Sequence, residues 1–467
     1  MLAAKLIIPA RNGLTDIGVN VISVFLGTVF LWMTEGIGWT SLLAIGMLGT
    51  TGVMSYSQIA QNSFGNWVTI YTIVSSILNY SLMEAGIIDR IVKWFVTRRF
   101  LRGKPWLFIA TWLFAIYVVS LVMNSTSVAL VILPMVTALC AEIGSQKGDK
   151  LPKILLMGSV ISILLGYNAT PISHSIPVTF LGLVNRDFNV QLTFFDWCKV
   201  GVPVSLLMFA VMILFFRIVM RTDVSSVEQV DVEAMRNSIQ PMTAKQKTIS
   251  ITYLIVIFVW LMPTIFQNIL PELAARVNGI GYSVPVIIAV VILNAIKDRD
   301  GQSYMNFDAA VKSVSWPLII LTAAIMLMNP CMSAETAGIN VFLTNTLGAA
   351  FQSSASKWLI VLIAAAWVVI QTNFMSCNVS GHLVYTIMTP LALLAPHLGL
   401  SAVSLGIMIA YGCDIAFLTP PACGPAAVFL STDYFTPKDA MRYGAPIVAI
   451  YILICAFVMY PLGVMLL

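Results

Sequence analysis

Long apolar stretches separated by short polar connections dominate the chain. A helix that crosses a bilayer needs about 20 mostly apolar residues, whereas a membrane β-barrel shows strands of about ten residues with alternating polarity. The first pattern is present and the second is not. It predicts helical spans or limbs over residues 17–34, 40–56, 65–84, 105–123, 126–143, 153–184, 200–220, 248–270, 281–296, 314–332, 356–374, 380–395, 402–431 and 443–466.

Polar residues interrupt some of these stretches at depth. NATPISHS (168–175) breaks the span 153–184, and LTPPACGP (418–425) breaks the span 402–431. The limbs around Asn124 predict a hairpin over 105–143, and those around Asn378 predict a second hairpin over 356–395. Each hairpin fits either a re-entrant loop or two full crossings.

Composition and charge place the chain in the bilayer. Hydrophobic residues make up 59% and charged residues 10%, against roughly 25% charged residues in soluble proteins. The seven cysteines form no CxxC pair, so neither a disulfide framework nor a zinc site is indicated. The net charge of +5 fits basic cytoplasmic loops and calls for no nucleic-acid partner. We expect a multi-pass protein of the cell (inner or plasma) membrane.

The basic loops also orient the chain. Lysine and arginine cluster in 90–104, 147–153 and 217–247, which should therefore face the cytoplasm. The long polar segment 221–247 divides the chain into a first half, 1–220, and a second half, 248–467.

The two halves share four matches in the same order. Glu84-Ala85-Gly86-Ile87 matches Thr336-Ala337-Gly338-Ile339, Asn124 matches Asn378, Thr170-Pro171 matches Thr419-Pro420, and Asp196-x-x-Lys199-x-Gly201-x-Pro203 matches Asp439-x-x-Arg442-x-Gly444-x-Pro446. Five crossings per half would invert one half relative to the other. An inverted repeat of 5+5 helices with hairpins and broken helices is typical of secondary transporters.

The breaks predict binding sites near the middle of the membrane. Unpaired N–H groups at a helix start attract carboxylates, and unpaired carbonyls with side-chain oxygens suit a hard cation such as Na⁺. Proline disfavours helical geometry in the preceding residue. Thr170 and Thr419 should therefore lie at unwound points beside Pro171 and Pro420, with their hydroxyls available.

These features resemble the divalent anion:sodium symporter family of the ion transporter superfamily. The resemblance covers essentially the whole chain and rests on MNSTSVALVILP (123–134), TNFMSCNVSGH (372–382), NATPIS, LTPPACGPAA and GLVNRDFNVQLTFFDWCKVGVP (182–203). It implies a homodimer, two re-entrant hairpins with Ser-Asn-Thr tips, and a further helix upstream of the first one seen here.

By this resemblance, each hairpin tip and its helix break form half of the site. The first half-site comprises Asn124, Ser125, Thr126, Ala169 and Thr170, and the second comprises Ser376, Cys377, Asn378, Leu418 and Thr419. Among these, Asn124, Ala169, Asn378 and Leu418 are candidate Na⁺ ligands, together with Ser120 and Thr372 just before the tips. The tips read Asn-Ser-Thr and Ser-Cys-Asn rather than Ser-Asn-Thr, so Ser380-Gly381-His382 stays open as an alternative second tip.

Three ionisable residues fall near the breaks. His174 follows the first break, His382 follows the second tip, and Asp414 is expected one helical turn before the second break. An ionisable group inside a membrane helix suggests a functional site. Each of the three is a candidate for proton or substrate contact, or is satisfied by neighbouring polar groups.

The sequence therefore favours a secondary active transporter of small di- or tricarboxylates that uses Na⁺ as coupling ion, needs no cofactor and works by elevator-like alternating access. An H⁺-coupled anion carrier or antiporter is the alternative that Asp414 and the histidines favour. A channel or an intramembrane hydrolase is a more distant alternative, because a duplication suits alternating access better than one catalytic centre.

Overall fold

The fold of the chain was obtained as a computed structural model. It describes residues 10–467 except 102, 147, 231, 268, 299, 340, 343, 344, 346–355, 395–397, 431 and 433. The described part is built from helices and connecting turns, with a single isolated bridge between Lys297 and Ser303 in place of a sheet. Two of the predicted spans, 380–395 and 402–431, end at residues 395 and 431, which lie outside the described residues.

The described part of the first half contains ten α-helices before the polar linker, and the first nine run from α2 to α10. They are α2 (Asp16–Thr34), α3 (Gly38–Gly49), α4 (Tyr56–Asn62), α5 (Trp67–Glu84), α6 (Ile87–Val96), α7 (Pro105–Ser120), α8 (Ser125–Glu142), α9 (Lys150–Ala169) and α10 (Ser175–Asp187). α11 (Phe194–Leu214) follows and continues as a π-turn over Phe215–Val219.

The linker carries a 3₁₀ turn over Ser225–Gln229 and the short helix α12, and the helices of the second half follow. The helices are α12 (Val232–Asn237), α13 (Ala244–Phe266), α14 (Pro271–Ile280), α15 (Ser283–Ala295), α16 (Phe307–Lys312), α17 (Trp316–Ser333), α19 (Lys357–Thr372), α20 (Cys377–Leu394), α21 (Ala402–Gly412), α22 (Gly424–Phe429), α23 (Pro437–Asp439), α24 (Ala445–Ile454) and α25 (Tyr460–Leu466).

Most predicted spans correspond to helices, with two corrections. The predicted span 40–56 is wrong, because α3 ends at Gly49 and Ser55 starts α4 with a capping box. The predicted span 200–220 begins too late, because Thr193 and Asp196 form a capping box that starts α11 at Phe194. Both starts carry a polar cap that hydropathy alone ignores.

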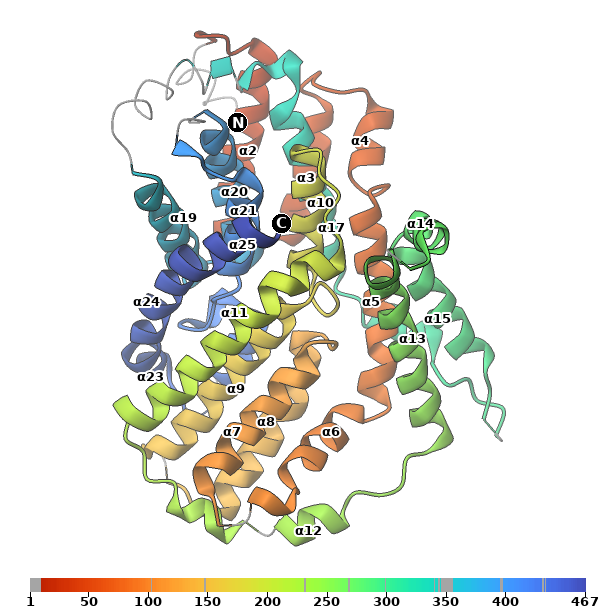
Figure 1. Cartoon of the computed structure of the whole chain (residues 1–467). Helices are drawn as coiled ribbons and strands as arrows, with labels where there is room; N and C mark the ends of the chain where they lie inside the picture. Colours follow the sequence, from red (N-terminus) through yellow and green to blue (C-terminus); the bar gives the residue numbers. More distant parts are fainter. Residues whose placement is uncertain are drawn as a thin grey trace.

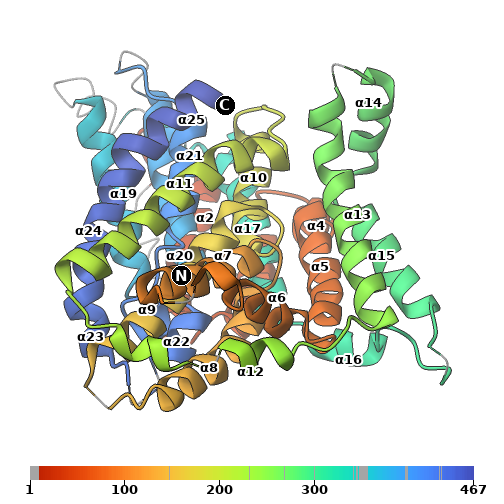
Figure 2. The ribbon, with the colours of Figure 1, turned by 60° about the horizontal axis from the view of Figure 1, so that its bottom comes forward.

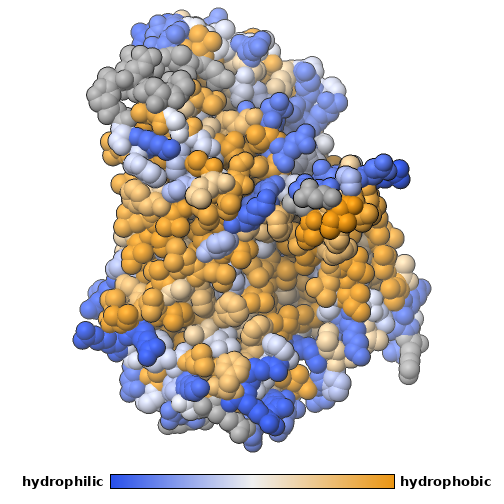
Figure 3. Space-filling view, viewed as in Figure 1, coloured by the Kyte–Doolittle hydropathy of each residue, from blue (hydrophilic) through white to orange (hydrophobic). Residues whose placement is uncertain are grey.

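The surface agrees with a membrane protein. Figure 3 shows a broad apolar band across the middle of the molecule, with polar residues gathered at its two ends. Six described helices are long and apolar enough to cross a membrane, or seven if α14 and α15, which meet at a 72° bend, form one span. α9 lies at the centre, since 94% of its apolar window is buried inside the protein.

The two halves carry matching hairpins. α7 and α8 form the first and α19 and α20 the second, and Figure 1 shows them entering from opposite ends of the molecule. Gly86 and Gly338 both adopt left-handed backbone conformations, with φ of 67° and 66°, which glycine tolerates best. Both halves also have a capping box at the Asp196 and Asp439 motifs. The fold is thus the all-α inverted repeat with two hairpins and two broken helices.

Outer helices flank these hairpins. α3 packs on α17, α15 packs on α5, and Figure 2 shows α13, α14 and α15 standing as a group beside α5. The hairpins instead pack on the broken helices: α7 and α8 contact α9, while α19 and α20 contact α21. Tips and breaks therefore meet inside the protein.

Candidate functional site

The first hairpin tip is organised by Asn124. Its side-chain oxygen accepts hydrogen bonds from the backbone N–H groups of Thr126 at 3.0 Å and Ser127 at 3.4 Å. This N-cap satisfies donors that an uncapped helix start leaves unpaired. Asn124 thus sets where α8 begins.

The first helix break is bonded to that tip. α9 ends before Thr170, which is extended with φ of −133° and ψ of 145°, as expected before Pro171. The Thr170 hydroxyl donates to the carbonyl of Leu121, and the Ser173 hydroxyl donates to the carbonyl of Ser120 at 2.8 Å. Two side-chain hydroxyls therefore join the break to the tip of the first hairpin.

The second tip and break are joined by a side-chain amide. The Nδ2 group of Asn373 donates to the carbonyls of Val369 at 2.8 Å and Ile415 at 2.7 Å. Its Oδ1 atom accepts from the N–H groups of Phe417 at 3.0 Å and Leu418 at 2.9 Å. Fully buried, this one residue satisfies four backbone groups, three of them in the unwound segment after α21.

Two threonines reinforce this second contact. The Thr419 hydroxyl donates to the carbonyl of Asn373, and the Thr372 hydroxyl donates to the carbonyl of Cys413. Since α21 ends at Gly412, the unwound segment starts earlier than residue 418. Asp414 was predicted one turn before the break, which is wrong: it lies inside the break.

One cavity of about 350 Å³ lies where the tips and breaks converge. Residues from both halves line it: Asn124, Ser125, Thr126, Tyr167, His174, Leu318, Ser376, Cys377, Asn378, Pro420, Ala422, Cys423, Gly424, Pro425 and Ala427. The starts of α8 and α20 both open onto this cavity. The described lining contains no lysine, arginine or carboxylate, so helix starts and neutral polar groups dominate it.

Other candidate residues are not part of the cavity wall. They are Ser120, Ala169, Thr170, Pro171, Thr372, His382, Asp414, Leu418 and Thr419. The hydroxyls of Thr170 and Thr419 each donate to a tip carbonyl, and their oxygen lone pairs are the part that is left for a ligand. The structure places these threonines as the joints between hairpin and break.

Asp414 lies behind the wall of the cavity and meets His174, which is part of that wall. His174 Nε2 lies 3.5 Å from Asp414 Oδ1, and the Tyr167 hydroxyl donates to the same oxygen at 3.3 Å. His382 is elsewhere: it is buried within α20 and stacks on Phe180 with ring centroids 4.7 Å apart. Of the two histidines near the breaks, His174 alone lines the cavity.

The structure also corrects the register of the repeat. Ser376 is the last residue before α20, so it occupies the position that Asn124 occupies before α8. Asn378 therefore corresponds to Thr126, and matching the two asparagines slips the register by two residues. The alternative tip Ser380-Gly381-His382 is wrong, because these residues lie within α20.

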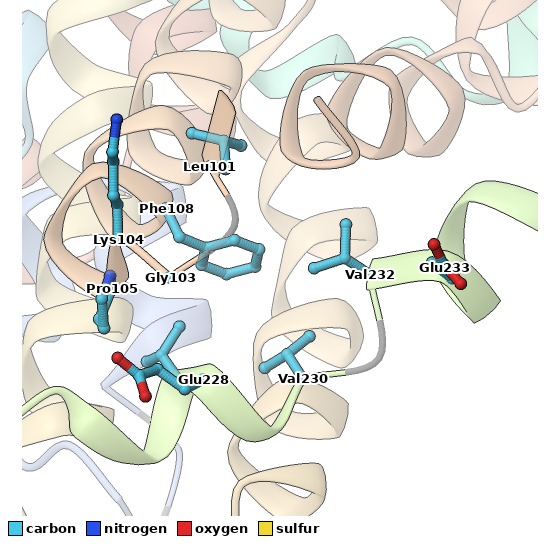
Figure 4. Close-up of a pocket in the computed structure, with 10 residues that line it drawn as sticks. Leu101, Gly103, Lys104, Pro105, Phe108, Glu228, Val230, Val232 and Glu233 are labelled. Carbon is cyan, nitrogen blue, oxygen red and sulfur yellow. The ribbon is translucent and has the colours of Figure 1, made fainter. Parts of the chain in front are cut away.

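A second cavity, of about 380 Å³, lies away from the breaks. In Figure 4, Leu101 and Phe108 face Val230 and Val232 from the linker, and Glu228 lies at one side. Its walls come from the turn before α7 and from the linker, and it includes no hairpin tip or helix break. We therefore take the cavity between the tips as the candidate site.

A family model described as "Citrate transporter" matches residues 29–380. This chain belongs to the citrate transporter family. The match confirms the family resemblance seen in the sequence, and the family is one of transporters rather than enzymes. This member is accordingly a multi-pass membrane protein and a secondary transporter.

Relatives of this family member extend over most of its length. An uncharacterized transporter of Haemophilus influenzae is 22% identical over 93% of this chain and 89% of its own. An uncharacterized transporter of Methanocaldococcus jannaschii is 25% identical over 70% of this chain and 67% of its own. The crystal structure of the Alcanivorax borkumensis YdaH transporter, which is reported to have an unusual topology, shares the fold with a TM-score of 0.57 at 11% identity, covering 95% of this chain and 98% of that one.

Sequence reasoning missed three residues of the site in this citrate transporter family member. Asn373 holds the second break, Ser173 helps to hold the first, and Tyr167 contacts Asp414. A signal was available for Asn373, which lies beside Thr372 in the second tip segment. Ser173 and Tyr167 gave none, because their partners are distant in sequence.

Proposed function

We propose that this protein carries small di- or tricarboxylates across the cell membrane and binds them in the cavity between the two hairpin tips. The convergence of Asn124, Ser125 and Thr126 with Ser376, Cys377 and Asn378 on one cavity carries this proposal. The starts of α8 and α20 direct their positive dipole ends and N–H groups toward it. Two separated N-terminal ends suit an anion with carboxylates at its two ends.

Sodium is the coupling ion in this proposal. Oxygen atoms gather where each tip meets its break: the Thr170 and Ser173 hydroxyls with the tip carbonyls in one half, and the Thr419 and Thr372 hydroxyls with carbonyls in the other. Hard cations prefer such neutral and carbonyl oxygens. In this proposal the backbone carbonyls of Ala169 and Leu418 serve as further ligands of the ion.

Proton coupling is the second candidate, and a specific contact favours it. Asp414 is a buried carboxylate inside the membrane region, and His174 and Tyr167 approach the same oxygen of it. Intramembrane carboxylates paired with histidine are typical of proton pathways. In this version Asp414 takes up and releases the proton.

The transport cycle would be of the elevator type, in a homodimer. The hairpins pack on the broken helices, which supports movement of this group as one body against the outer helices α3, α5, α15 and α17. Substrate and ion would cross with this body. The inverted repeat supports the two end states that such exchange requires.

Uptake into proteoliposomes tests the function. Purified protein is reconstituted, and accumulation of labelled succinate and citrate is followed under a Na⁺ gradient, a pH gradient or no gradient. We expect accumulation driven by Na⁺. Accumulation driven only by pH would transfer the coupling to Asp414 and His174, and no uptake of either compound under any gradient would contradict the substrate class.

A further inference from the structure

Three potential metal ligands from distant segments meet beside the cavity. His174 comes from the first break, Cys377 from the start of α20 and Asp414 from the second break, and one ligand atom of each lies within 4.8 Å of the others. Two donors at tetrahedral positions around one Zn²⁺ ion are about 3.3–3.8 Å apart, given bond lengths of about 2.0–2.3 Å. Small side-chain movements therefore bring all three atoms to bonding distance.

The protein satisfies this cluster only in part: Asp414 Oδ1 accepts from Tyr167 and lies 3.5 Å from His174 Nε2, while other atoms lack partners within the residues that the structure describes. Asp414 is 1% exposed, and its Oδ2 atom has no hydrogen-bond partner among the described residues. The Nε2 atom of His174 is buried and likewise has no hydrogen bond in the described part of the chain. A buried carboxylate without full pairing is costly. A cation placed among these atoms removes that cost.

The donor types select the cation. One imidazole nitrogen, one thiolate sulfur and one carboxylate oxygen suit Zn²⁺ and similar borderline ions, whereas Na⁺ and Mg²⁺ prefer oxygen alone. Three protein ligands also leave the fourth tetrahedral position open. Because His174 and Cys377 line the cavity, that position faces the space where a small molecule or water can enter.

We propose that His174, Cys377 and Asp414 form a binding site for a borderline divalent cation such as Zn²⁺. Binding replaces the thiol proton of Cys377, which leaves to solvent, with a metal–sulfur bond. The ion joins the second hairpin to both breaks and so restrains the two halves of the transporter against each other. The site shares Cys377 and His174 with the wall of the anion cavity, but the ligand assignment rests on the geometry of the three donors and not on the transport proposal.

Cobalt is the probe for this site, since thiolate ligation of Co²⁺ gives a charge-transfer absorption band. Purified full-length protein without a histidine tag is titrated with Co²⁺ and then with Zn²⁺. We expect the band to grow to about one equivalent and Zn²⁺ to remove it. Cys377→Ser should abolish the band, and His174→Ala and Asp414→Asn should each weaken Co²⁺ binding about tenfold or more.

Cys423 provides the matched control. It lines the same cavity, but its thiol donates to the carbonyl of Ala416 at 3.0 Å and it is not part of the cluster. Cys423→Ser should keep the band. A band that persists in Cys377→Ser and disappears in Cys423→Ser would overturn the assignment, as would stable wild-type protein that gives no band.

A second measurement on unmodified protein covers the case in which Cys377→Ser fails to fold. The rates at which a thiol reagent alkylates Cys377 and Cys423 are measured by peptide mass spectrometry with and without Zn²⁺. We expect Zn²⁺ to slow alkylation of Cys377 at least tenfold and to leave Cys423 within about twofold. Equal rates at Cys377 with and without Zn²⁺ would contradict the proposal.

Discussion

The two half-sites of this transporter share the bond from the break threonine to the tip carbonyl, Thr170 to Leu121 and Thr419 to Asn373, and differ in their other bonds. In the first half, the hydroxyls of Thr170 and Ser173 join the break to the tip. In the second half, Asn373 takes most of this role, and Leu121 stands at its equivalent position in the first tip. The duplicated architecture has been kept while some of the residues that fasten it have diverged.

The length of each unwound segment explains the difference. The first break runs only from Thr170 to His174, whereas the second runs from Cys413 to Thr419 before the short turn at Pro420. A longer break leaves more backbone groups without helical partners, and in a buried region each must be paired. An amide has two N–H donors and an oxygen with two lone pairs, whereas a hydroxyl has a single donor, so an amide can pair more backbone groups in a longer break.

Removing the side-chain amide of Asn373 should have the largest effect. Asn373→Leu gives the second tip the residue type found in the first, and it leaves the N–H groups of Phe417 and Leu418 and the carbonyl of Ile415 unpaired. Since an unpaired buried group costs about 1–3 kcal/mol, we expect unfolding in detergent at a much lower temperature and loss of transport.

The control is Asn378→Leu. It makes the same chemical change five residues later, in the first turn of α20. The only hydrogen bond described for the Asn378 side chain is a weak one to Cys377 Sγ at 3.9 Å. Its unfolding temperature should fall much less. Equal losses in the two variants would show that the Asn373 bonds do not hold the second break.

The next largest effects are expected from alanine substitutions at the two tips, which should differ in how much folding free energy they lose. Asn124→Ala and Asn378→Ala should each abolish uptake, because both side chains line the proposed anion site. Asn124→Ala should also lose about 1 kcal/mol of folding free energy with its helix cap, while Asn378→Ala should lose little. Denaturation curves and uptake are measured on the same preparations, and near-normal uptake in both variants would refute the site.

A smaller effect is expected at the threonines. Thr170→Val and Thr419→Val each remove one hydrogen bond between tip and break, worth about 1 kcal/mol, and one oxygen from a proposed Na⁺ site. We expect a higher Na⁺ concentration for half-maximal uptake in both. Thr170→Ser keeps the hydroxyl and serves as the control; identical Na⁺ dependence in Thr170→Val and Thr170→Ser would exclude a role for this oxygen.

The smallest effect concerns the discarded alternative tip. Ser380 is buried inside α20, and its hydroxyl has no partner among the described residues. Removing a buried hydroxyl that has no partner is neutral or stabilising. Ser380→Ala should therefore transport normally and unfold at an equal or higher temperature, whereas loss of transport would return the second tip to this segment.

The sequence predicts the helices well and the bonds between them poorly. Hydrophobic stretches set most helix positions, and the Thr-Pro pairs located both unwound points correctly. The span 40–56 and the start of α11 were misplaced because Ser55 and Thr193 act as caps within or beside apolar stretches. Local signals of this kind compete with hydropathy, and hydropathy alone does not weigh them.

The composition of the site was predictable only in part. Asn124, Ser125, Thr126 and their second-half counterparts follow from the polar tips. The roles of Asn373 and Asp414 depend on where α21 ends, and contacts such as Asn373 with Ile415 join residues far apart in sequence. Without the fold, the spacing of these residues does not reveal that they meet.

The central claim is that the anion binds between the two tips and not in the cavity beside the linker. Thr126→Cys and Glu228→Cys place one thiol in each cavity, and peptide mass spectrometry follows their modification by a polar thiol reagent with and without citrate or succinate. We predict that the transported anion slows modification at position 126 and leaves position 228 unchanged. Protection at position 228 alone would contradict the account.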